Sequence, residues 1–115
     1  MEKIITRKLE KKNFGHPDET KSNPYFKVET IKLGDTTFTK QTFQPGWKWS
    51  KDVKPLMKTD MCPLLHKGVL LSGKMHIVVE NGNELDIMPG DVIIIPPRHD
   101  GWVVGNEPAV FYEIQ

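Results

Sequence analysis

The sequence predicts an all-β domain, and three observations support this. Apolar segments in the second half are short, turn residues separate them every 8–12 residues or so, and Gly or Pro interrupts each candidate helix before three turns are complete. A chain of 115 residues is long enough for one domain with one core. With 37% hydrophobic and 27% charged residues, it has the composition of a globular domain and not of a disordered chain.

The first 29 residues predict an N-terminal arm that lies on the domain and contains one short strand, because short apolar pieces alternate there with charges and prolines. The domain proper is expected over residues 30–115. Apolar periodicity begins at Val28, and residues 37–43 are rich in threonine and aromatic side chains, as strands are. The dipeptide Pro45-Gly46 predicts the turn that ends this strand.

The second half predicts a series of short antiparallel strands that form a sandwich or a barrel. The expected strands contain residues 69–71, 75–79, 85–88, 92–95, 102–104 and 109–114. Between them lie Ser72-Gly73, Asn81-Gly82, Pro89-Gly90, Pro96-Pro97 and Gly105-Asn106. Proline cannot donate to a β-ladder, so the proline pair is expected to end a strand or to lie at a bulge.

Two stretches resemble the motifs of the cupin family: residues 66–75, His-Lys-Gly-Val-Leu-Leu-Ser-Gly-Lys-Met, and residues 88–97, Met-Pro-Gly-Asp-Val-Ile-Ile-Ile-Pro-Pro. The resemblance covers residues 40–113 and implies a double-stranded β-helix, that is, a jelly-roll barrel. The stretch from residues 45–50 through residues 102–105 also resembles a subgroup of small one-domain cupins, most of which lack an assigned reaction. The resemblance therefore implies a fold and an interior pocket, but no substrate.

The resemblance also implies four metal-ligand positions inside the barrel. In this chain they fall on Asp60, Cys62, His66 and Gly101, and each departs from the usual residue. Carboxylate, thiolate and imidazole all bind transition metals, whereas glycine has no side chain to do so. His99 precedes Gly101 by two residues and so shares its face of a strand. The candidate site is therefore Asp60, Cys62, His66 and His99, and the candidate metal is one divalent zinc, iron or copper ion.

The spacing of these residues sets a geometric expectation. Residues 60, 62 and 66 share one parity, but on a regular strand Cys62 and His66 would lie about 13 Å apart. A direct hydrogen bond between Cys62 and His66 is excluded within such a strand. A metal shared by the two residues requires a bend in the chain, which Pro63 would supply. The alternative is a metal-free pocket, in which Cys62 is a small buried side chain and the histidines bond to neighbours.

The expected ligand pocket is formed by Trp47, Trp49, His66, His99 and Trp102. Core packing is the alternative for the tryptophans. His76 has the opposite parity to its apolar neighbours and is expected to point outward. Arg98 stands where related turns place glycine, and it is expected on the surface, with Asp100 as a candidate partner.

Three functions fit these features. The first is a small cupin that holds a small-molecule ligand in its interior without an assignable reaction. The second, which is the main alternative, is a metal-dependent enzyme that is similar to cupin dioxygenases or isomerases and uses His66, His99 and Cys62. No glutamate lies near the motifs to act as its general base. The third is a purely structural or dimerisation unit.

Charge and composition bear on partners and location. A net charge of +1, without a single basic run or a recognition helix, argues against nucleic-acid binding. No stretch approaches the roughly 20 apolar residues of a membrane span, no signal peptide is apparent, and the single cysteine fits a reducing cytoplasm. Residues 109–114 are expected to form a hydrophobic terminal strand at a sheet edge that a partner or the N-terminal arm must cover, and a homodimer is the state we expect.

Overall fold

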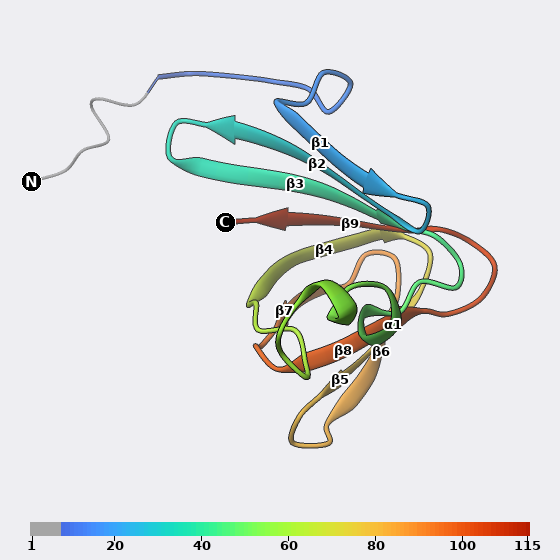
Figure 1. Ribbon diagram of the computed structural model, residues 1–115. Coiled ribbons are helices and arrows are strands. Elements are labelled where there is room, and N and C mark those ends of the chain that lie inside the picture. Colours follow the sequence, from blue (N-terminus) through green and yellow to red (C-terminus); the bar gives the residue numbers. More distant parts are fainter. Residues whose placement is uncertain (1–7) are drawn as a thin grey trace, which may run out of the picture.

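Two antiparallel sheets make up most of the structure, a computed structural model that describes residues 8–115 (Figure 1). One sheet has the strand order β1-β2-β3-β9-β4-β7, and the other has the order β6-β5-β8. The strands are β1 (Glu19–Asn23), β2 (Phe26–Leu33), β3 (Thr36–Phe43), β4 (His66–Ser72), β5 (Met75–Val79), β6 (Glu84–Ile87), β7 (Val92–Ile95), β8 (His99–Val103) and β9 (Ala109–Ile114). The all-β, jelly-roll class predicted from the sequence is confirmed.

The core lies between the two sheets because strands from both turn one face inward. In β8 and β9 buried residues alternate with less buried ones, as a pleated strand with one covered face requires. Leu70 of the larger sheet and Ile87 of the smaller one are almost fully buried. The buried hydrophobic residues of the two sheets form one cluster.

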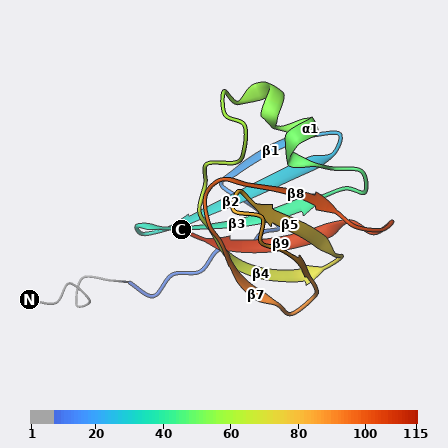
Figure 2. The ribbon, with the colours of Figure 1, turned by 90° about the horizontal axis from the view of Figure 1, so that it is seen from below.

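Two helical turns, α1 (Trp49–Asp52) and η2 (Lys54–Leu56), lie between β3 and β4. In the view of Figure 2, α1 stands on the opposite side of the fold from β7. Isolated β-bridges join this connection to β8, one from Lys48 to Trp102 and one from Cys62 to His99. The second bridge determines where Cys62 lies in the fold.

The predicted turns are confirmed by backbone geometry. Gly73 and Gly90 take φ values of 78° and 93°, and β7 ends at Ile95 directly before the proline pair. At Gly73 a Cβ would also lie 2.4 Å from the carbonyl oxygen of Pro108, so glycine is required there. Arg98 takes a φ of 67° at the position where related turns place glycine.

In the N-terminal region one strand lies wholly within the expected arm, and a second strand crosses the expected boundary. The boundary between residues 29 and 30 falls inside β2, and β1 and β2 form a regular hairpin with Glu19 opposite Thr30. Residues 1–7 lie outside the described part of the chain, and residues 8–18 precede the first strand. Phe14 of this segment packs against Tyr112 of β9, with ring centroids 5.4 Å apart.

The last strand is not an edge, which corrects a second expectation. β9 lies inside the larger sheet and pairs with β3 on one side and β4 on the other. The argument for a homodimer from an uncovered strand at residues 109–114 is therefore wrong. The homodimer stays a prediction without this support.

A membrane-spanning helix is not found in residues 8–115, where no helix has the length and apolar character to span a bilayer.

Candidate functional site

A cavity of about 220 Å³ lies between the sheets and is open to solvent on one side. Most of its wall is apolar, and its polar side chains are Gln41, Cys62, His66 and His99. The lining residues are Phe26, Gln41, Phe43, Trp47, Trp49, Val53, Cys62, Leu64, His66, Met75, Ile77, Ile87, Ile95, His99, Gly101 and Phe111. A mostly apolar cavity with a few convergent polar groups is the usual form of a small-molecule site.

Three predicted site residues, Cys62, His66 and His99, come together at the wall of this cavity. Each offers one ligand atom, and these atoms lie within 4.8 Å of one another. His66 and His99 are the first residues of β4 and β8, and Cys62 is bridged to His99 by a backbone hydrogen bond of 2.8 Å from its N–H to the His99 carbonyl. The cluster is therefore assembled from the first residues of β4 and β8 and from the β-bridge that holds Cys62 beside His99.

The Cys62–His66 distance corrects the expectation drawn from a regular strand. The Cys62 Sγ lies 3.8 Å from the His66 Nε2, and not about 13 Å away. Residues 63–65 belong to no strand, because β4 begins only at His66, and the chain bends between the two side chains. The chain is thus not extended between the two residues, and Cys62 and His66 are in direct contact.

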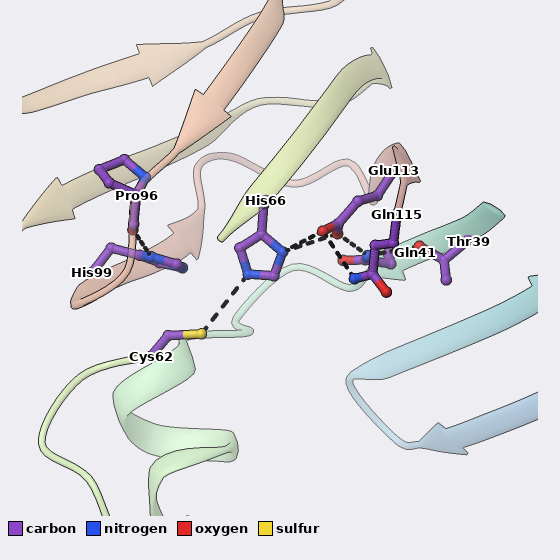
Figure 3. A network of polar contacts seen from close by, with 8 residues as sticks. All are labelled: Thr39, Gln41, Cys62, His66, Pro96, His99, Glu113 and Gln115. Carbon is purple, nitrogen blue, oxygen red and sulfur yellow. Dashed lines mark hydrogen bonds and ion pairs between the residues drawn. The ribbon is translucent and has the colours of Figure 1, made fainter. Parts of the chain in front are cut away.

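Both histidines are oriented through their Nδ1 atoms. His66 Nδ1 lies 2.8 and 2.9 Å from the two carboxylate oxygens of Glu113, and His99 Nδ1 lies 2.7 Å from the carbonyl oxygen of Pro96 (Figure 3). A carboxylate or a carbonyl accepts, so each Nδ1 carries the proton and donates. The Nε2 atoms are therefore left for the cluster, and Figure 3 shows His66 between Cys62 and Glu113.

Glu113 is the residue that the sequence analysis missed. We expected no glutamate near the motifs, but in the folded chain Glu113 of β9 contacts His66. Its side chain is buried and only 1% exposed. Gln41 Nε2 donates to its Oε1 at 2.6 Å, and Gln115 Nε2 donates to its Oε2 at 3.4 Å. A signal was present: Glu113 shares the parity of Ala109 and Phe111, the buried face of an apolar strand.

The charges of the three groups are coupled. Burial raises the pKa of the Cys62 thiol, but hydrogen bonds from His66 and His99 outweigh burial and lower this pKa to about 6. Burial lowers the pKa of His66, but its contacts with Cys62 and Glu113 raise this pKa to about 9. Burial raises the pKa of Glu113, and the bond from His66 brings it below its ordinary value. At neutral pH, without a metal, the row is a thiolate, an imidazolium and a carboxylate.

Asp60 does not join the cluster, which corrects its assignment as a metal ligand. Its side chain is 88% exposed and faces Lys54, with a nitrogen–oxygen distance of 3.9 Å. Residues 57–61 form bends and not a strand, so the parity that linked Asp60 to Cys62 does not apply.

Trp102 is likewise not a pocket residue. Its ring lies 4.9 Å from that of His76, and the Lys48 ammonium sits 4.7 Å from the Trp102 ring centroid. Because His99 points inward at the start of β8, the alternation of the strand turns Trp102 to the outer face. Both the pocket assignment and the core alternative are wrong for it.

Trp47 and Trp49, by contrast, line the cavity, and both are 5% exposed.

The other polar predictions are mixed. His76 points outward as expected, and its nitrogens lie 2.7 and 2.8 Å from Asp86 and Glu84. Arg98 is on the surface but pairs with Glu80 and not with Asp100. Asp100 instead accepts from the backbone N–H of Ser50 at 3.1 Å.

The donor set fits a transition metal. A tetrahedral zinc ion with bonds of about 2.3 Å to sulfur and 2.0–2.1 Å to nitrogen places the two donors about 3.6 Å apart, close to the observed Cys62–His66 distance of 3.8 Å. The pairs with His99 are at most 4.8 Å apart, so one metal would reach all three donors with no more than small side-chain shifts. Gly101 lines the cavity without a donor, so a metal held by the other three residues would keep a fourth position open.

The comparisons with known proteins concern the fold. No family model matches the sequence, and no curated protein matches it. A protein of unknown function from Rhizobium leguminosarum is similar, with a TM-score of 0.67 at 15% identity over 93% of this chain and 95% of that one. The Schizosaccharomyces pombe Cnp3 cupin domain gives 0.62 at 14% identity over 84% and 66%. A cupin superfamily protein from Desulfitobacterium hafniense gives 0.56 at 15% identity over 83% and 80%.

Proposed function

We propose, for a chain that has the cupin fold, that Cys62, His66 and His99 bind one divalent transition metal, which holds a small oxygen-bearing molecule in the cavity. The observation that carries this proposal is the cluster itself. Three donor atoms from separate segments converge within 4.8 Å, and the other nitrogen of each histidine is already engaged. One sulfur and two imidazole nitrogens suit zinc, and also iron or copper.

The roles of the residues follow from their contacts. A bound metal of this kind supplies a Lewis acid that polarises an oxygen group of the ligand. Glu113 and the Pro96 carbonyl fix the tautomer and direction of His66 and His99, as partners of metal-binding histidines commonly do. Glu113 is engaged by His66 and by the amides of Gln41 and Gln115, so it is a positioning residue and not a free base.

Metal content tests the proposal directly. We expect protein purified without chelators and reconstituted with zinc to retain about one zinc per chain after desalting, measured by plasma mass spectrometry. The His66→Gln and His99→Gln variants are expected to retain almost none. The matched control is His76→Gln, which removes a histidine bound to two carboxylates on the outer face and should keep the metal. A wild-type protein without retained metal, or full retention in His99→Gln, contradicts the proposal.

A second candidate is a metal-free thiol nucleophile, favoured by the row of Cys62, His66 and Glu113. The 3.8 Å and 2.8 Å contacts match the order of a nucleophile, a base and an orienting carboxylate. The two functions separate under chelation. An activity or ligand affinity that survives metal removal but is lost in Cys62→Ser supports the nucleophile, whereas loss on metal removal and recovery with zinc supports the metal site.

A further inference from the structure

Apart from the buried indole nitrogen of Trp47, the polar side chains of the cavity belong to the metal-site cluster or to its network with Glu113, which restricts what the cavity can hold. Among the described lining residues there is no lysine, arginine, carboxylate or hydroxyl side chain. The Gln41 amide nitrogen is used by Glu113 and Thr39, and each histidine Nδ1 is used as well. A sugar or a phosphorylated ligand would bury several unpaired polar groups, each of which lowers affinity by roughly ten-fold or more.

The size of the cavity sets a second limit. Its volume is about 220 Å³. An apolar protein cavity of about 150 Å³ accommodates benzene. The space therefore suits one six-membered ring with a short substituent, and it is too small for a nucleotide or an extended chain.

One part of the cavity wall is aromatic. Phe43 and Trp47 pack with ring centroids 4.5 Å apart, and Phe26 lies 5.0 Å from Phe43 and 5.9 Å from Trp47. All three rings line the cavity. Aromatic rings add an attraction to one another beyond that of area burial, so this wall favours a flat ring over a saturated one.

We infer that the ligand is a single-ring aromatic molecule with one oxygen head group. Its ring packs against the wall of Phe26, Phe43 and Trp47, and its head group reaches the cluster of Cys62, His66 and His99. This inference rests on the proposed function for the head group, because the metal held by Cys62, His66 and His99 would bind the oxygen. The ring-binding part depends only on the cavity.

The entrance provides a matched pair of variants. Leu64 and Leu65 are neighbours in sequence and are 52% and 49% exposed, but only Leu64 lines the cavity. Leu64 therefore lies at the mouth and contacts a bound ring. Truncation of Leu64 is expected to weaken binding roughly five-fold through lost apolar contact, whereas truncation of Leu65 leaves binding unchanged.

The test uses full-length protein in a Trp102→Phe background, so that Trp47 and Trp49 supply the tryptophan fluorescence. Zinc-loaded protein is titrated with benzoate, cyclohexanecarboxylate and ribose 5-phosphate, and metal-free protein with benzyl alcohol. Calorimetry and fluorescence report binding. We expect benzoate to bind at least five-fold more tightly than cyclohexanecarboxylate, ribose 5-phosphate not to bind, and Leu64→Ala to weaken benzoate binding while Leu65→Ala does not.

The outcomes separate the two proposals. If zinc is not retained but benzyl alcohol binds in a Leu64-dependent manner, the metal function fails and the ring-binding inference holds. If zinc is retained but neither benzoate nor benzyl alcohol binds, or ribose 5-phosphate binds as well as benzoate, the inference is overturned and the metal function stands. Preference for the saturated acid over benzoate also overturns it.

Discussion

His66 of β4 and Glu113 of β9 form a buried pair, in which the His66 Nδ1 lies 2.8 Å from one carboxylate oxygen and 2.9 Å from the other. Pairing of β4 with β9 places Gly68 opposite Glu113. This register brings the side chains of His66 and Glu113 together, although the two residues are 47 positions apart in the sequence. The pair aims the His66 Nε2 at Cys62 and so gives the cluster its geometry.

Glu113→Gln is expected to lower zinc affinity about 10–100-fold, because the neutral amide orients His66 less firmly and makes its Nε2 a poorer donor. Competition with a chromophoric chelator measures the change. Glu29→Gln is the matched control, since Glu29 is a buried carboxylate of the same sheet, 3.8 Å from Lys27. Equal affinity in Glu113→Gln and wild type would show that the pair does not support the metal.

The Cys62 thiol of metal-free protein is expected to ionise with a midpoint at pH about 6, where an ordinary thiol has a pKa of 9.0. Thiolate absorbance at low ultraviolet wavelengths follows the titration. His66→Gln should move the midpoint upward, because it removes the first of the two imidazoles that lower this pKa. A midpoint near 9 in the wild type would contradict the described geometry.

The same shift has a consequence for stability in the metal-free protein. The pKa of Cys62 is depressed on folding, so its contribution is fully present above pH 9 and is lost as the pH falls through about 6. The raised pKa of His66 acts in the opposite sense between pH 6.5 and about 9, so together the pair gives little slope. Cys62→Ser removes the Cys62 contribution but keeps the contact of His66 with Glu113, so the variant loses stability as the pH rises while the wild type changes little. The stability advantage of wild type over Cys62→Ser is therefore expected to grow from pH 6 to pH 9 in urea unfolding. An advantage that shrinks over this range would be inconsistent with the pair.

Gly68→Ala is expected to destabilise the fold by about 3 kcal/mol or more. A Cβ there would lie 2.0 Å from the Tyr112 carbonyl oxygen and 2.8 Å from the Phe111 ring, so β4 and β9 would have to separate. Gly82→Ala is the comparison: its φ is 94°, but nothing lies within 4 Å, so only backbone strain of about 1–2 kcal/mol is expected. Thermal unfolding ranks the two variants, and a smaller loss at Gly68 would be evidence against the β4–β9 register.

Trp47→Phe is expected to change stability by less than about 1 kcal/mol. The Trp47 Nε1 is buried and has no hydrogen-bond partner in the described part of the chain, so removal of this donor offsets part of the lost packing. Trp47→Ala, which removes the whole ring, should cost about 3–5 kcal/mol. Similar losses in the two variants would indicate that the indole nitrogen is paired in solution.

The strands of the second half could be predicted because their ends carry local signals. Gly73, Gly90 and the proline pair after Ile95 act through their own backbone preferences, which neighbouring strands do not alter. A short strand was expected in the N-terminal arm, but the bounds of β1 could not be predicted in the same way. Its residues are all exposed, so the strand lacks the apolar alternation that would reveal it, and it forms only by pairing with β2.

The candidate site was predictable in part for a similar reason. Motif spacing identified Cys62, His66 and His99, but the contact with Glu113 depends on which strand lies beside β4. The parity argument failed at Asp60 because the loop before Cys62 is not a strand. It would have succeeded at Trp102, since an inward His99 implies an outward Trp102.

X-ray absorption of the zinc-reconstituted protein tests the central claim most directly. We predict one sulfur at about 2.3 Å and two imidazole nitrogens at 2.0–2.1 Å, with a fourth light ligand, and loss of the sulfur shell in Cys62→Ser. A zinc shell made only of oxygen and nitrogen in the wild type, or a sulfur shell that persists in Cys62→Ser, would contradict a metal centre built from Cys62, His66 and His99.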